Sequence, residues 1–122
     1  MNVLLVDDSK AMRAIVKHKL REAGYGHWSI SEAHSGDEAY EISRISPPDL
    51  FLCDWNMPGI SGFDLLQKLK SDGCTARFGF VTSESGPEAR AMAIDAGALF
   101  LIVKPFTAED FQLAFESAGL RQ

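Results

Sequence analysis

With 122 residues, the chain is long enough for one domain with one hydrophobic core, and we expect that domain to span residues 1–122. A formal net charge of −5 argues against a dedicated nucleic-acid binder. Apolar runs of only strand length exclude a membrane span, and the first residues lack a signal-peptide pattern. Two cysteines make neither a disulfide framework nor a metal motif. These features predict a cytoplasmic protein, which we expect to be a monomer.

The first third of the chain predicts a strand, a helix and a second strand in succession. The apolar run 3–6 has strand length, and Ser9 follows it as a helix cap. Apolar residues at helical spacing carry this helix to about Ala23, after which Gly24 stands where a glycine commonly ends a helix. Residues 28–33 are then expected to form a short strand.

The middle of the chain predicts two helices on either side of a buried strand. The sequence Ser35-Gly36-Asp37-Glu38 is typical of a capping box, in which the first and last side chains bond to each other's backbone N–H groups. Pro47-Pro48 ends that helix before the continuous apolar run 50–53. After a turn marked by Pro58-Gly59, a third helix is expected over about 62–71.

The last third of the chain repeats this pattern twice. The run 78–81 predicts a fourth strand, and Ser85-Gly86-Pro87-Glu88 predicts another capping box for a helix that ends near Ala96. That helix has a weak apolar stripe. Residues 99–103 are expected to form the fifth strand, and Thr107 begins the final helix.

Strands and helices thus alternate five times along the chain. This alternation requires parallel pairing with right-handed crossovers and helices on both faces of the sheet. We therefore predict an α/β fold with a doubly wound five-stranded parallel sheet in the flavodoxin-like order 2-1-3-4-5. In this order the first and third strands are neighbours, which brings Asp7 and Asp8 beside Asp54.

Polar side chains stand directly after four of the expected strands: Asp7 and Asp8, Asp54, Thr82, and Lys104. In an open α/β sheet, ligands bind beyond the carboxyl ends of the strands. Three carboxylates at close range repel one another by about 3–4 kcal/mol for each pair near the protein surface. Such a cluster must hold protons or a cation, and an all-oxygen site favours Mg²⁺.

The reaction that suits this set of side chains is phosphoryl transfer. With Mg²⁺ lowering the repulsion, Asp54 is expected to attack phosphorus as a carboxylate nucleophile and to form an acyl phosphate. Lys104 is expected to bind one phosphoryl oxygen as a point charge, and the Thr82 hydroxyl to bind another. The main-chain carbonyl of Asn56, in the turn after the third strand, is the expected additional metal ligand.

Over its whole length the chain resembles the receiver domain of two-component response regulators. The similarity lies in the acidic pair Asp7-Asp8, in Asp54 within Asp-Trp-Asn-Met-Pro-Gly, in Thr82, and in Lys104-Pro105-Phe106. It implies that Asp54 is the phosphoacceptor, that Asp8, Asp54 and the Asn56 carbonyl bind Mg²⁺ directly, and that Asp7 acts through water. Self-catalysed phosphoryl transfer and dephosphorylation are implied, without a further enzymatic activity.

Within the family, the sequence is most similar to stand-alone chemotaxis regulators of the CheY type. Both have Asp-Trp-Asn-Met-Pro, Val-Thr-x-Glu and Ala-Gly-Ala, and we expect no effector domain after the receiver. The resemblance implies a histidine kinase or a histidine phosphotransfer domain as the phosphodonor and a downstream protein as the target. It also implies that Asn56 and Glu84 flank the phosphoryl group, as they do in regulators whose phosphorylated form decays quickly.

The chain departs from the family near the lysine. Receiver domains usually carry Tyr or Phe three residues before it, where this chain has Leu101, and Phe100 stands one residue earlier. Because side chains alternate along a strand, Phe100 is expected on the opposite face of the sheet. Gly79 in the neighbouring strand predicts weaker packing there.

Four alternatives to a phosphorylation switch follow from the same residues. A flavin-type electron carrier is excluded because Asp7 and Asp8 would repel the flavin phosphate. An aspartyl phosphatase is excluded because Asn56 stands where that chemistry needs a second acid. Two alternatives stay open: a phosphorelay intermediate that passes the phosphoryl group onward, and a binding module that works without phosphorylation, which the aliphatic Leu101 would suit.

Overall fold

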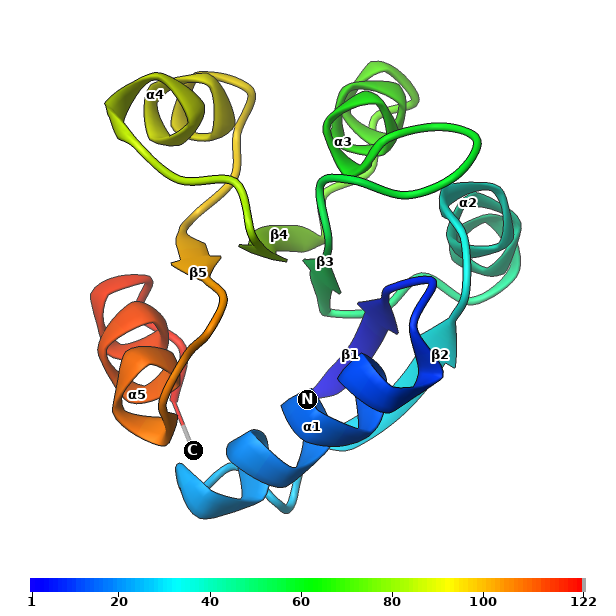
Figure 1. Cartoon of the computed structure of the whole chain (residues 1–122). Helices are drawn as coiled ribbons and strands as arrows, with labels where there is room; N and C mark the ends of the chain where they lie inside the picture. The colour runs from blue at the N-terminus through cyan, green and yellow to red at the C-terminus, as the bar shows by residue number, and fades with distance from the viewer. Residues whose placement is uncertain (122) are drawn as a thin grey trace.

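The computed structural model describes residues 1–121, in which strands and helices alternate from end to end (Figure 1). The elements are β1 (Asn2–Val6), α1 (Lys10–Glu22), β2 (Ser29–Ala33), α2 (Gly36–Ile45), β3 (Leu50–Cys53), α3 (Gly62–Ser71), β4 (Arg77–Thr82), α4 (Pro87–Asp95), β5 (Leu101–Val103) and α5 (Ala108–Ser117). Within these residues, no helix is long and apolar enough to cross a membrane.

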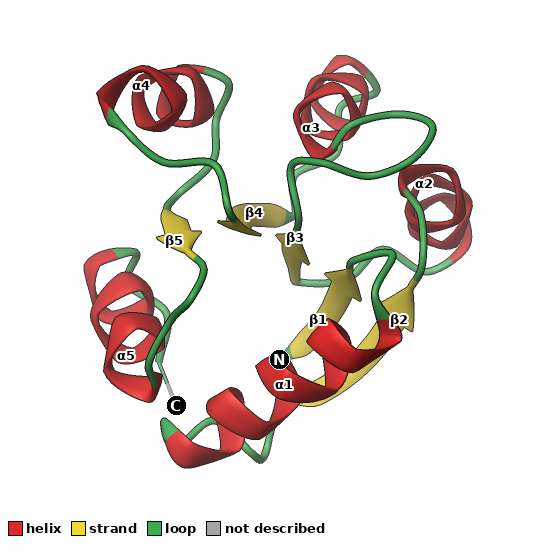
Figure 2. Cartoon of the chain, viewed as in Figure 1, coloured by secondary structure: helices red, strands yellow, loops and turns green. Residues whose placement is uncertain are grey.

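The strands form one parallel sheet in the order β2-β1-β3-β4-β5, which confirms the predicted topology (Figure 2). Helices α1 and α5 lie on one side of the sheet, and α2, α3 and α4 lie on the other (Figure 1). From β1 the chain first adds β2 on one side and then crosses back to add β3 on the other side, so the strand order reverses between β1 and β3. At this point Val6 pairs with Cys53. The carboxyl ends of these two strands therefore meet at the switch point of the fold.

The central strands are apolar at every position because each face of the sheet is covered by helices. Along β3, Leu50 and Leu52 enter the core beneath α1 and α5, whereas Phe51 and Cys53 enter the core beneath the other three helices. All four side chains are fully buried. A strand buried on both faces reads as a continuous apolar run, which is why the sequence predicted β3 well.

Two predicted capping boxes differ from the structure. The Ser35 hydroxyl accepts a hydrogen bond from Glu38 N as expected, but the Glu38 carboxylate accepts one from His34 N, so the box is only partly formed. The box at Ser85 is wrong, because the N-cap of α4 lies one residue later, at Gly86 with φ of 99°, and the helix has no side-chain cap. Pro87 has no N–H to be capped, and a left-handed residue before it favours glycine.

The aromatic departure from the family pattern has a structural partner in β4. Phe100 and Leu101 lie on opposite faces of the sheet, as the alternation predicted. The Phe100 ring covers Gly79, so that an ideal Cβ built on Gly79 would lie 2.1 Å from a ring carbon. We expected weaker packing at Gly79, but the Phe100 ring fills the space that its missing side chain leaves. Strand β5 is also shorter than predicted, since it begins at Leu101 rather than at residue 99.

Candidate functional site

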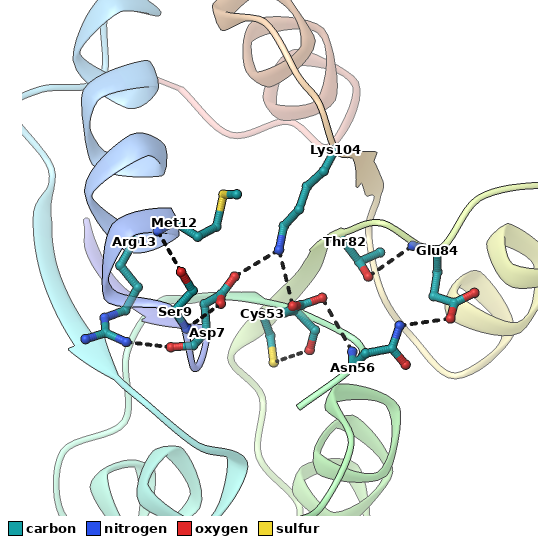
Figure 3. Close-up of polar contacts among 10 residues, drawn as sticks. Asp7, Ser9, Met12, Arg13, Cys53, Asn56, Thr82, Glu84 and Lys104 are labelled. Carbon is teal, nitrogen blue, oxygen red and sulfur yellow. Dashed lines mark hydrogen bonds and ion pairs between the residues drawn. The ribbon is translucent and has the colours of Figure 1, made fainter. Parts of the chain in front are cut away.

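The residues that the sequence singled out gather at the carboxyl edge of the sheet (Figure 3). Asp7 directly follows β1, and Asp54 directly follows β3, its neighbour in the sheet. Thr82 ends β4, and Lys104 follows β5. Since all five strands are parallel, their carboxyl ends share one edge, and side chains from distant parts of the chain face one another there.

Three carboxylates form the centre of the site. One oxygen from each of Asp7, Asp8 and Asp54 lies within 4.8 Å of the other two. Asp7 and Asp54 are only 4% and 8% exposed, whereas Asp8 is open to solvent. At that separation and an effective dielectric constant near 20, each pair of charges repels by about 3.5 kcal/mol. The cluster therefore needs positive charge close by.

Lys104 supplies part of that charge. Its Nζ donates to Asp7 Oδ2 at 3.0 Å and to Asp54 Oδ2 at 3.2 Å. Burial by itself would lower the pKa of Lys104, but the hydrogen bond to Asp7 and the charge on Asp54 outweigh it, so the pKa is raised. The ammonium group thus stays charged, and one positive charge faces three negative ones.

The three carboxylates differ in how many of their oxygens are already used. Asp7 Oδ1 accepts from Ser9 N at 2.9 Å while its Oδ2 accepts from Lys104, so both oxygens have donors. Asp54 has Lys104 on one oxygen and a long contact of 3.4 Å from Asn56 N on the other. Asp8 has no hydrogen bond or ion pair to any residue that the structure describes. Its oxygens are the most available for a cation.

Thr82, Asn56 and Glu84 form a chain of hydrogen bonds beside the carboxylates (Figure 3). The Thr82 hydroxyl is fully buried and accepts from Glu84 N at 3.2 Å. Asn56 Nδ2 donates to Glu84 Oε1 at 2.9 Å. These contacts join the loop after β3 to the loop after β4. They involve the side chain of Asn56, and its main-chain carbonyl as a metal ligand stays a prediction.

Two residues at the site escaped sequence reasoning. Gly62 opens α3 against the backbone of Asp54, and a Cβ there would lie 2.0 Å from the Asp54 carbonyl oxygen. Arg13 Nη1 donates to the Asp7 carbonyl at 2.6 Å. Helical spacing predicted only that Arg13 lies on α1, and nothing in the sequence indicated that its side chain turns back to the site.

Trp55 adjoins Asp54 and is half-buried. Its ring stacks on Phe63 with centroids 5.2 Å apart and packs against Phe80 at 4.9 Å. The indole, one residue from Asp54 in the chain, is therefore packed against α3 and β4. This arrangement makes its fluorescence a natural reporter of changes at the carboxylate cluster.

The fold and the carboxylate cluster together define a signalling domain, and comparison with known proteins identifies its class. The sequence model of the response regulator receiver domain matches residues 3–116, and the chain belongs to this family. The resemblance drawn from Asp7-Asp8, Asp54, Thr82 and Lys104 is thereby confirmed at the level of the family. Receiver domains bind Mg²⁺ at an acidic pocket, and this chain has such a group of carboxylates.

Among curated proteins, the chain is similar to CheY-type chemotaxis regulators. It is 39% identical to the chemotaxis protein CheY1 of Helicobacter pylori, over 88% of this chain and 87% of that protein. It is 38% identical to CheY-3 of Vibrio cholerae, over 88% and 83%. The solved structure of Vibrio cholerae CheY4 superposes with a TM-score of 0.81 at 28% identity, covering 96% of this chain and 97% of that one.

Proposed function

We propose that this chain, acting as a single receiver domain, accepts a phosphoryl group from a phosphohistidine onto Asp54 and thereby switches a surface that binds a downstream protein. One observation supports this above the others. Three carboxylates from two neighbouring strands converge, and a lysine from a third strand is bonded to two of them. Such concentrated charge destabilises a fold unless the site binds ions, here a cation at the carboxylates and a phosphoryl group at the lysine.

The oxygen-only donors fit Mg²⁺. Asp8 and Asp54 are the direct carboxylate ligands in this proposal. Both oxygens of Asp7 accept short hydrogen bonds, so Asp7 would act through water, whereas Asp54 Oδ1 has only a long contact of 3.4 Å. The Asn56 carbonyl is the third direct ligand. When bound, Mg²⁺ would lower the repulsion between Asp54 and an incoming phosphoryl group.

In the transfer step, a carboxylate oxygen of Asp54 attacks phosphorus while the P–N bond to the donor histidine breaks. The imidazole nitrogen keeps the electron pair of that bond and takes a proton from solvent. Lys104 and the Thr82 hydroxyl move to oxygens of the transferred group. In the separate, self-catalysed dephosphorylation, water attacks phosphorus and the bond between phosphorus and the Asp54 oxygen breaks. Asp54 leaves as a free carboxylate, inorganic phosphate is released, and the proton lost by the water goes to solvent.

Transfer adds about two negative charges at Asp54. In the proposed switch, this charge draws Lys104 and Thr82 from their present partners and so disturbs the linked loops after β3 and β4. Helix α4 follows the second of these loops and buries only Ala93 among residues 87–95. Beside it, a groove of about 610 Å³ between α4, β5 and α5 is lined by apolar residues that include Ile94, Leu99 and Leu113. This face is the proposed site for the downstream partner.

The proposed phosphodonor is a histidine kinase or a histidine phosphotransfer domain, and the proposed pathway is of the chemotaxis type. The contact between Asn56 and Glu84 beside the site suits a short-lived phosphorylated form. A phosphorelay intermediate is the second candidate within the same chemistry. Leu101 at the usual aromatic position favours, as a further candidate, a binding module that needs no phosphorylation.

The test adds Mg²⁺ and then acetyl phosphate or beryllofluoride, with Trp55 fluorescence as the readout. We expect a change at each addition, and intact mass should show one phosphoryl group after acetyl phosphate. Asp54→Asn should abolish the second response, whereas Asp64→Asn, at an exposed acid on α3, should leave both responses unchanged. Unchanged Trp55 fluorescence together with an unchanged mass would contradict the proposal and support the binding module.

A further inference from the structure

Arg13 reaches from the first turns of α1 back to the end of β1 (Figure 3). Its Nη1 donates to the Asp7 carbonyl oxygen at 2.6 Å, and its side chain is 13% exposed. The same guanidinium group donates through Nε to Glu32 Oε1 at 2.9 Å. One planar cation therefore spans the turn that carries Asp7 and Asp8 and the strand β2 beside it.

We infer that Arg13 is a positioning residue for the cation site: it fixes the Asp7–Asp8 peptide so that Asp8 faces Asp54. Glu32 neutralises the positive charge that Arg13 brings close to the site. The inference rests on the proposed Mg²⁺ site. It assigns Arg13 no contact with the metal or the phosphoryl group. Its effect is exerted through the backbone of the acidic turn.

The hydrogen bonds of Asp7 show why a backbone contact matters here. Its N–H donates to Ala33 O at 3.1 Å, its carboxylate has donors on both oxygens, and its carbonyl is held by Arg13. Every polar atom of Asp7 is thus fixed. Asp8 has no polar contact within the described part of the chain, so its direction depends on the peptide plane that it shares with the Asp7 carbonyl. Fixing that carbonyl fixes where the Asp8 side chain begins.

The contact also removes an unwanted ligand. A free carbonyl oxygen beside three carboxylates would be another hard donor for a cation and could draw it away from Asp54. With the guanidinium on it, the Asp7 carbonyl is occupied. The carboxylates of Asp8 and Asp54 then remain the oxygens that face the site.

A positive charge beside a metal site would by itself weaken metal binding, and Glu32 offsets this effect by pairing with Arg13. Glu32 accepts from Arg13 at 2.9 Å and from Lys17 Nζ at 2.9 Å. The hydrogen bond from Lys17 is the largest cause that lowers the pKa of Glu32, so this carboxylate is ionised at neutral pH. Arg13 can therefore hold the backbone while its charge is paired away from the three aspartates.

A charge effect and a positioning effect predict opposite signs. If Arg13 acted only as a nearby positive charge, Arg13→Ala would tighten Mg²⁺ binding, and Arg13→Lys would change nothing. If it positions the turn, Arg13→Ala should weaken Mg²⁺ binding about tenfold, in the range usual for residues that orient metal ligands. Arg13→Lys should also weaken it, because one ammonium cannot hold the carbonyl and Glu32 in the geometry of the planar fork.

The experiment titrates Mg²⁺ against Trp55 fluorescence in the wild type, Arg13→Ala, Arg13→Lys and the control Arg21→Ala, with melting temperatures recorded alongside. Arg21→Ala removes an exposed charge from the same helix and should bind Mg²⁺ like the wild type. Glu32→Gln should weaken binding in the wild type and have no effect when combined with Arg13→Ala.

The outcomes separate this inference from the proposed function. A wild-type chain that ignores millimolar Mg²⁺ would overturn the proposed function itself. A wild type that binds Mg²⁺, with Arg13→Ala binding as tightly or more tightly, would overturn the role of Arg13 and leave the site intact. Should Arg13→Ala fail to fold, Arg13→Lys decides, since it keeps the charge and unchanged affinity there contradicts positioning.

Discussion

Replacement of Gly79 by alanine tests how Phe100 is held in the core. In a strand, glycine is normally the weaker choice, and alanine would be expected to stabilise by about 0.5–1 kcal/mol. At this position the added Cβ would lie 2.1, 2.2 and 2.7 Å from three atoms of the Phe100 ring. The two shortest distances are more than 1 Å below an ordinary carbon contact of about 3.5–4.0 Å, and the third is also too short, so the ring must move.

The surroundings of the ring leave it little freedom to move. Phe100 is 6% exposed and packs edge-on against Phe115, with ring centroids 5.5 Å apart. Overfilling a packed core typically costs about 1–3 kcal/mol, which exceeds the gain in strand propensity. After subtraction of that gain, we expect Gly79→Ala to lower the free energy of unfolding by about 1 kcal/mol, within a range of about 0–2.5 kcal/mol.

Urea unfolding followed by Trp fluorescence would measure this loss, with the slope compared to confirm that only stability has changed. Phe100→Leu provides the partner for a double-mutant cycle. Because the alanine methyl group would occupy space that the ring vacates, the double variant should lose about 1 kcal/mol less than the sum of the single losses. Stabilisation by Gly79→Ala, or strictly additive losses, would refute the packing argument.

Three further predictions concern the site and its supports. Lys104→Met should lower stability by about 1–3 kcal/mol without metal, because Asp7 and Asp54 lose their shared cation, and millimolar Mg²⁺ should shrink that loss in urea unfolding. Glu32→Gln should be less stable than the wild type above pH 4.5, the ordinary pKa of this carboxyl, and the difference should vanish in thermal melts as pH falls through the lowered folded pKa. Glu84→Ala, which removes the 2.9 Å contact with Asn56, should lengthen the life of the phosphorylated form after the donor is withdrawn.

Each of these has a result that counts against it. An equal loss for Lys104→Met with and without Mg²⁺ would mean that metal and lysine do not share the same carboxylates. A difference between wild type and Glu32→Gln that grows as pH falls would reverse the sign expected for a carboxyl with a lowered pKa. Faster or unchanged decay in Glu84→Ala would contradict a role for the loop contact in dephosphorylation.

Much of the fold was predictable because its signals are local. A strand buried on both faces needs apolar side chains at every position, so the run that contains Phe51 and Cys53 stood out from its surroundings. The prediction at Ser85 was wrong because a capping box is defined by residue types alone. The backbone at Gly86 and Pro87 decides where the helix begins, and a short pattern cannot report its φ angle.

The sequence predicted which residues form the site, but not which hydrogen bonds they make. Strand ends carry their polar residues to a shared edge once the sheet is parallel, which is why Asp7, Asp54 and Lys104 could be expected together. Which oxygen each donor uses depends on rotamers that the sequence does not encode locally. Only the geometry shows that both carboxylate oxygens of Asp7 accept hydrogen bonds, whereas those of Asp8 accept none from the residues that the structure describes.

The sequence by itself determined the order of strands and helices, the family, and the carboxylates that gather at the switch point, since each follows from short patterns and from their order along the chain. Only the tertiary structure decided that Arg13 returns to hold the Asp7 carbonyl and that Phe100 fills the space above Gly79. Both contacts join segments whose proximity depends on how the strands and helices pack together. Packing of that kind is a property of the whole chain, and no local window contains it.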